Sequence, residues 1–79
     1  NVIQISENDV RQYKSKSINS KLYSAEKNGI RNYYYCNLID FKGDAGVFAW
    51  ILFTGTPSYA EENIDMWDEI TSSVVLIEK

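Results

Sequence analysis

The side chains with the most potential for chemistry in this sequence are carboxylates. Asp40 and Asp44 bracket a predicted turn. A predicted helix face further along the chain carries Glu61, Asp65 and Asp68. Carboxylate oxygens grouped in this way suit a weak Ca²⁺ or Mg²⁺ contact. A turn and a helix face that simply meet solvent have the same pattern, and we prefer that interpretation. We therefore predict no metal site and no cofactor.

Histidine is absent from the sequence. Its absence excludes nucleophile pairs of the Ser–His and Cys–His types. It also excludes the side chain that most often serves as a general base at neutral pH and as a metal ligand. The glycines are spaced as turn residues, and none opens a helix in the pattern of a phosphate-binding loop. A pair of acids acting on a glycoside would need a cleft that so small a fold hardly provides. We expect a protein without catalytic residues and keep a small metal- or thiol-dependent enzyme as an alternative.

Cys36 is the only cysteine of the chain, and it lies in the middle of a predicted strand beside Tyr35. A single cysteine cannot form an internal disulfide, so the cysteine content is compatible with both an oxidising and a reducing compartment. A buried, inert thiol is the usual state of a cysteine at such a position. The functional alternative is a mixed disulfide or a redox sensor.

Aromatic side chains surround this cysteine in the stretch RNYYYCNLIDF. Because side chains alternate along a strand, Tyr33 and Tyr35 must point one way and Tyr34 and Cys36 the other. A helix can cover only one of these faces. The other would still carry several aromatic side chains, and soluble monomers rarely leave so large an apolar patch open.

Two explanations of this uncovered sheet face stay open. Residues 1–16 fold over it, or it binds a protein partner, a ligand or a second copy of the chain. On the second hypothesis the candidate contacts are Tyr33, Tyr35 and Trp50, because Tyr and Trp often anchor interfaces. Trp67 we assign to the core.

Predicted strands position these aromatic side chains. Asn28 and Gly29 form the pair preferred in a type I′ turn, which joins two strands by only two residues. Apolar side chains fall on both faces of the segment VFAWILFTG, as in a central strand covered on both sides. The expected strands span 17–26, 30–41 and 47–55, with a second turn at 42–46.

The segment before this meander is less regular. Residues 1–5 (NVIQI) have the β-branched composition of a short strand. Ser6, with Asp9 three residues on, is a possible cap for one or two helical turns within 7–16.

A helix is predicted for the last part of the chain. Thr56 or Ser58 can cap it, with Pro57 near its first position, and Ser58 with Glu61 matches a capping box. An apolar stripe of helical period then follows, and residues 74–77 (VVLI) are expected to end the chain as a short strand. The stripe consists of Ala60, Ile64, Trp67, Thr71 and Val74. The predicted fold is a single α+β domain over 1–79: an antiparallel meander of three to five strands with a C-terminal amphipathic helix packed on one face.

Charge is divided unevenly along the chain, whose net charge is −3. Residues 1–42 hold seven basic and four acidic side chains, whereas residues 43–79 hold one basic and seven acidic ones. We expect the two halves to pack together and partly neutralise each other. The alternative is an immunity or antagonist protein whose acidic helix neutralises a basic partner, using Glu61, Glu62, Asp65 and Asp68. Nucleic acid is disfavoured as a partner, because its binding needs a basic surface, and no apolar run is long enough for a membrane span.

The order of elements over roughly residues 17–77 resembles the C-terminal half of the PsbP/DcrB-like superfamily. That group closes with a strand, a short loop, and a helix whose apolar residues precede a Ser and a final hydrophobic strand. The corresponding positions are Phe53, Thr54, Tyr59, Ile64, Trp67, Ile70, Ser73, Val75 and Ile77. The resemblance implies a role as an assembly factor, periplasmic lipoprotein or chaperone for hydrophobic segments, acting through the curved sheet face without catalytic residues.

We therefore expect a non-enzymatic binding protein, a small adaptor, chaperone or assembly factor that uses an aromatic sheet face and can form a homodimer. The chain begins at Asn1 and not at Met. That start fits removal of a signal peptide or an expressed segment without its native start. Between the two we favour an exported, periplasmic protein over a cytoplasmic one.

Overall fold

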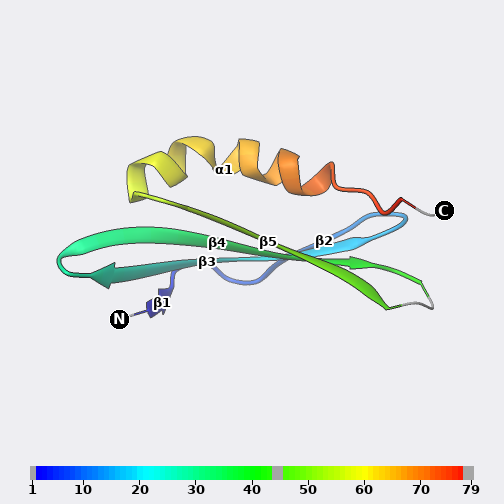
Figure 1. Ribbon diagram of the computed structural model, residues 1–79, viewed down its shortest axis with the longest axis horizontal. Coiled ribbons are helices and arrows are strands. Elements are labelled where there is room, and N and C mark those ends of the chain that lie inside the picture. The colour runs from blue at the N-terminus through cyan, green and yellow to red at the C-terminus, as the bar shows by residue number, and fades with distance from the viewer. Residues whose placement is uncertain (1, 44–45, 78–79) are drawn as a thin grey trace.

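The computed structural model describes residues 2–43 and 46–77 of the 79-residue chain. One helix lies along one face of an antiparallel sheet of five strands (Figure 1). The sheet order is β1-β3-β4-β5, and β2 also pairs with β3. The elements are β1 (Val2–Gln4), β2 (Asp9–Gln12), β3 (Ser17–Lys27), β4 (Ile30–Phe41), β5 (Val47–Gly55) and α1 (Pro57–Ser72). The predicted α+β fold with a C-terminal helix is confirmed.

The β3–β4 hairpin has the predicted two-residue turn. Asn28 and Gly29 have φ angles of 54° and 78°. Positive φ at both central positions is the requirement of a type I′ turn, which Asn and Gly meet at the lowest steric cost. The strands then pair without interruption from Lys27 opposite Ile30 to Ser17 opposite Asp40. The prediction of an Asn-Gly hairpin is therefore confirmed.

β5 pairs along its whole length with β4, from Val47 opposite Phe41 to Gly55 opposite Tyr33. It lies at the edge of the sheet, and one of its faces is largely exposed. The expectation of a central strand covered on both faces is therefore wrong, because apolar content alone does not distinguish a buried strand from an exposed apolar one. Residues 44 and 45, within the predicted turn at 42–46, lie outside the described residues, so the predicted pair of Asp40 with Asp44 lies outside them through its second member.

The N-terminal segment follows the far edge of β3. The helical turns expected within 7–16 are wrong, since Asp9–Gln12 form strand β2 and pair with β3. Ser6 does not cap a helix, because its Oγ accepts a hydrogen bond from the Leu22 N–H at 2.8 Å. The unpaired backbone groups of the β3 edge thus outweigh a weak local helical preference. The expected strand at 74–77 is also not formed.

Helix α1 is capped by Thr56, whose side-chain oxygen accepts a hydrogen bond from the Tyr59 N–H at 3.4 Å, and Pro57 occupies the first helical position. At its other end Lys16 supplies the missing donors. The Lys16 ammonium donates to the carbonyl oxygens of Ser72 and of Val74, the latter at 2.6 Å. Only 6% of Lys16 is exposed. A cation at this end of a helix is favoured by the helix dipole as well as by the free carbonyls.

The core lies between α1 and the sheet. One cluster gathers around Ile18, Ile39 and Phe41, with Val74 packed against it. In the second cluster the Trp67 ring stacks on both Phe53 and Tyr35, with ring centroids at 5.1 and 6.4 Å. That cluster consists of Tyr35, Ala60 and Trp67, with Leu22, Tyr33, Phe53 and Ile64 around it. Trp67 belongs to the core, as predicted.

Replacement of Lys16 tests how far this lysine holds the helix end in place. Lys16→Ala removes the donor to the carbonyls of Ser72, at the end of α1, and of Val74, just after it, so we expect the free energy of unfolding in urea to fall by about 1–3 kcal/mol. Lys14→Ala is the control, because Lys14 is exposed and two residues away. Equal unfolding free energies for the two variants would contradict the capping role.

Candidate functional site

The side of the sheet that α1 does not cover is the candidate site, and we call it the open face. Large apolar side chains are exposed there: Trp50 by 74%, Phe48 by 57%, Leu52 by 56% and Leu38 by 43%. They come from the two neighbouring strands β4 and β5. The open face is therefore a continuous apolar surface, which is rare on a soluble monomer.

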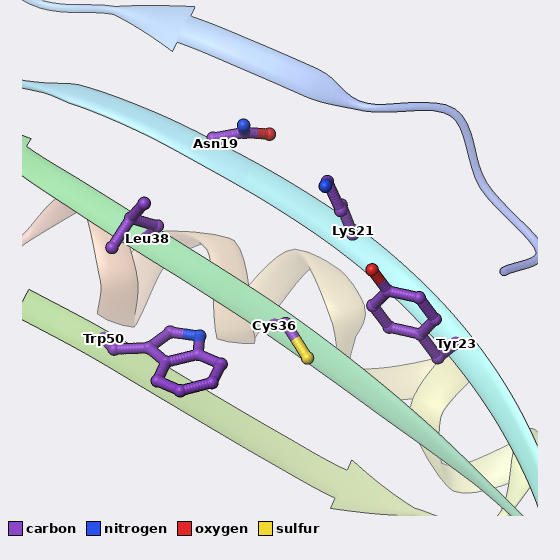
Figure 2. Close-up of a pocket in the computed structure, with 6 residues that line it drawn as sticks. All are labelled: Asn19, Lys21, Tyr23, Cys36, Leu38 and Trp50. Atoms are coloured by element: carbon purple, nitrogen blue, oxygen red, sulfur yellow. The ribbon is translucent and has the colours of Figure 1, made fainter. Parts of the chain in front are cut away.

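A shallow pocket of about 370 Å³ lies at the centre of the open face. Figure 2 shows its lining side chains standing on the three longest strands, with α1 on the far side of the sheet. Trp50 and Leu38 form its apolar side, and Lys21 contributes a positive charge at the other side. The lining residues are Asn19, Lys21, Tyr23, Cys36, Leu38 and Trp50.

The register of the strands brings these side chains together. Leu38 lies directly between Asn19 on β3 and Trp50 on β5. Cys36, two residues earlier on β4, lies between Lys21 and Leu52. Side chains opposite each other in neighbouring strands are close enough for contact. Each row across the sheet thus begins with a polar side chain on β3 and ends with an apolar one on β5. The pocket therefore has a charged side at β3 and an apolar side at β5.

Cys36 is half-buried and lines this pocket, so it is less buried than the buried, inert thiol predicted at this mid-strand position. Burial raises the pKa of its thiol above the usual value, and the nearby Lys21 opposes this shift. A raised pKa keeps the thiol protonated at neutral pH, whereas the thiolate is the nucleophile. Cys36 is therefore suited to packing against an apolar ligand and poorly suited to covalent chemistry.

The structure separates the three sheet residues predicted to contact a partner. Tyr35 is only 5% exposed and Tyr33 is half-buried, because both lie in the cluster under α1. Trp50 lies on the opposite, open face. The three side chains consequently do not share a surface. The alternation of side chains along a strand shows which residues share a face of the sheet. The packing of the helix decides which of the two faces stays open.

The four acidic residues predicted to contact a basic partner are also divided. Glu61, Glu62 and Asp65 are exposed on α1. Asp68 instead accepts a hydrogen bond from the Tyr35 hydroxyl at 2.6 Å, and one of its oxygens lies 3.6 Å from Arg11 Nη2. Asp68 is thus used within the fold.

A polar network missed in the sequence links α1 to the sheet through this aspartate. Arg11 donates to Ser20 Oγ at 3.1 Å, and Ser20 Oγ donates to Asn37 Oδ1 at 2.6 Å. Asn37 is fully buried. The only signal was the presence of Ser20 and Asn37 at positions alternating with apolar residues, and their pairing became apparent only from the strand register.

The same network changes the acidity of Tyr35. Burial, followed by the hydrogen bond to Asp68, raises the pKa of Tyr35 from 10.0 to about 12, while a hydrogen bond with Ser20 acts in the opposite direction. The neutral phenol is therefore stabilised in the folded state.

No group of three or more potential metal-ligating side chains gathers within residues 2–43 and 46–77. In the same part of the chain, α1 is too short and too polar to cross a membrane.

High pH tests the link between Tyr35 and Asp68. The pKa of Tyr35 is higher in the folded state than in the unfolded state, so its neutral phenol stabilises the fold. This stabilisation is complete below pH 10 and is lost as the pH rises towards 12. We expect the neutral Tyr35 phenol to contribute about 2–3 kcal/mol of unfolding free energy. Tyr35→Phe should lack this part of the decline, and Asp68→Asn should show less of it. Unfolding in urea at several pH values measures it, and parallel pH profiles for wild type and Tyr35→Phe would contradict it.

Comparison of the chain with family models, curated proteins and solved structures gave no match. The resemblance to the PsbP/DcrB-like superfamily stays a prediction. The open face, defined by its own geometry, is the feature from which a function can be argued.

Proposed function

We propose that this protein is a non-enzymatic binding protein, an adaptor, chaperone or assembly factor that holds an apolar segment of another protein on its open face. The observation that carries the proposal is the group of exposed apolar side chains around the pocket, Leu38, Phe48, Trp50 and Leu52. Burial of such side chains on binding is favourable in proportion to the apolar area removed from water.

The N-terminal segment does not provide this cover. β1 and β2 extend the sheet beyond β3 instead of crossing the open face. Trp50 accordingly keeps 74% of its surface exposed. A partner is therefore the stronger of the two explanations that the sequence left open.

The chemistry of the pocket specifies the kind of segment that fits. An apolar side chain of the partner would enter between Leu38 and Trp50, where Trp provides a large rigid surface. A carboxylate or carbonyl oxygen of the partner would meet the Lys21 ammonium and the Asn19 amide at the polar side. An apolar segment with an adjacent acidic or polar residue is the expected ligand.

Suppression of aggregation tests this proposal. Trp50→Ser and Leu38→Ser remove apolar surface that the fold itself exposes, so stability should change by no more than about 1 kcal/mol. We expect wild type to slow the aggregation of reduced insulin chains, measured by light scattering, and each variant to lose most of this effect.

Ile3→Ser is the matched control, because Ile3 is 53% exposed but belongs to β1, opposite Ser24, on the side of the sheet that faces α1. It should behave as wild type. Equal suppression by wild type, Trp50→Ser and Leu38→Ser would argue against the open face as the binding surface.

A second candidate function uses the acidic side of α1. Glu61, Glu62 and Asp65 are exposed there, and these three acids are available to neutralise a basic protein. Asp68 is excluded from this surface by its contacts with Tyr35 and Arg11. The thiol-dependent enzyme gains no such support, since the raised pKa of Cys36 disfavours a thiolate.

Salt dependence separates the two functions. Capture of a basic protein such as lysozyme through α1 should weaken steeply with added salt and be lost in a Glu61→Lys, Glu62→Lys, Asp65→Lys variant. Binding through the open face should survive the lysine substitutions and weaken only slightly with salt, because salt screens the Lys21 contact but not the burial of apolar surface. Biolayer interferometry over a salt series measures the difference.

A further inference from the structure

The outer edge of β5 has no partner within residues 2–43 and 46–77. β5 has nine residues, VFAWILFTG, with no charged side chain and no proline. Its pairing with β4 is continuous, so no bulge turns the edge away. Natural edge strands are usually protected by Lys, Pro, a bulge or a covering segment. β5 has none of these protections, whereas β1 and β2 cover the far edge of β3.

An apolar strip of α1 runs above this edge, and we call it the helix flank. Its large members are Tyr59, Met66 and Ile70, which are exposed by 52%, 45% and 44%. Their spacing of seven and four residues places them on one side of the helix. The acidic residues Glu62 and Asp65 lie outside this strip, towards solvent.

Contacts of α1 with the sheet show that the helix flank faces the outer edge of β5. Tyr59 packs so closely on Gly55, the last residue of β5, that a Cβ at Gly55 would lie 2.8 Å from the Tyr59 ring. Asp68, on the other side of α1, reaches Tyr35 on β4 and Arg11 on β2. The helix flank and the bare strand edge therefore form one continuous apolar border of the molecule.

We propose that this border is the dimer interface of the protein, with β5 of one copy pairing antiparallel with β5 of a second copy. A two-fold axis near Ile51, the middle residue of β5, would join two sheets into one and bring the two helix flanks together. Such an interface uses the same surface patch on both subunits, as two-fold symmetry requires.

The position of α1 suits this arrangement. Trp67 stacks on both Tyr35 of β4 and Phe53 of β5, so the helix lies above these two strands. With strands spaced about 4.8 Å apart, pairing of the two β5 strands would place the two helix axes about 10 Å apart. Packed helices are separated by about 8–10 Å. Strand pairing and helix packing can therefore be satisfied at the same time.

The size and charge of the border favour a second copy as its occupant. A nine-residue strand is about 30 Å long, and sheet and helix layers together are about 20 Å thick, which gives about 600 Å² per copy. This area reaches the lower limit of specific stable interfaces. About the axis, Trp50 would lie opposite Leu52, so that apolar side chains meet across the new strand pair and no charge meets a like charge.

Dimerisation would also enlarge the open face. The rows of β5 side chains that include Trp50 and Leu52 would meet at the centre of the joined sheet, so two pockets would lie on one surface. The interface itself does not rest on the proposed binding function, because it is argued from the bare edge of β5 and from the helix flank, which lies on the other side of the sheet from the pocket.

Sedimentation velocity over a concentration series tests the dimer. We expect the mass of wild type to rise with concentration from 9.1 kDa towards twice that value. The variant Met66→Lys, Ile70→Lys places four lysines across the axis, and we expect it to weaken dimerisation by at least about a hundredfold. Both side chains are exposed in the single chain, so circular dichroism should show an unchanged fold.

Glu62→Lys is the matched control, because it changes the charge by the same amount on the exposed outer side of α1, and it should keep the dimer. Hydrogen exchange gives a second reading: amides of β5 should become more protected at high protein concentration, and those of β1 should not. A chain that stays monomeric at all concentrations would overturn the proposal. So would a dimer that Met66→Lys, Ile70→Lys leaves intact and that Trp50→Ser abolishes.

The same variants separate this inference from the proposed function. The monomeric Met66→Lys, Ile70→Lys variant keeps Leu38 and Trp50 and should still slow the aggregation of insulin chains. Failure of the dimer test together with retained suppression would remove the dimer and leave the binding function standing.

Discussion

The stacking of Trp67 against Phe53 and Tyr35 is the contact on which the arrangement of this small protein depends. Both faces of the β3–β5 meander carry aromatic side chains, so the sheet alone could accept a helix on either side. The short connection through Thr56 leaves α1 close to the end of β5, and the Trp67 ring then fills the space above β4 and β5. Once this side is chosen, the other face has no remaining element of the described chain to cover it.

Polar groups reinforce that choice. Asn37 and Ser20 are buried under the helix in the middle of the sheet, where each finds a partner in the other. Asp68 and Arg11 extend the network to α1 and β2. Buried polar groups are costly when their partners are missing, so this network disfavours other positions of the helix. The buried polar residues fix the position of the helix, but they occupy core positions that apolar side chains could fill. A domain of this size buries only a limited apolar area in any case.

The consequence is a molecule with two different apolar surfaces. The open face holds a pocket with one charged and one apolar side, which suits a side chain of another protein. The edge of β5 carries no charged side chain and lies beside the helix flank, and we propose that it pairs with a second copy. The pocket and the helix flank lie on opposite sides of the sheet.

The sequence by itself determined the elements whose causes are local. The Asn28-Gly29 turn, the Thr56-Pro57 helix start and the helical stripe through Trp67 depend on backbone preferences and on periods of two and 3.6 residues, which any reader of the chain can recognise. It also placed Tyr33 and Tyr35 on one face of their strand and Tyr34 and Cys36 on the other, since side chains alternate along a strand.

Tertiary structure alone decided which face was covered and which residues of the N-terminal segment became strand. The alternation of side chains along β4 places Tyr33 and Tyr35 on the same face, but it does not indicate whether a helix covers that face. In the structure α1 packs on it, so Tyr33 and Tyr35 do not lie on the open face. Residues 9–12 became β2 because the edge of β3 offered hydrogen bonds that no local signal reveals. The pocket and the Tyr35–Asp68 pair likewise join residues far apart in the chain, and only packing brings them together.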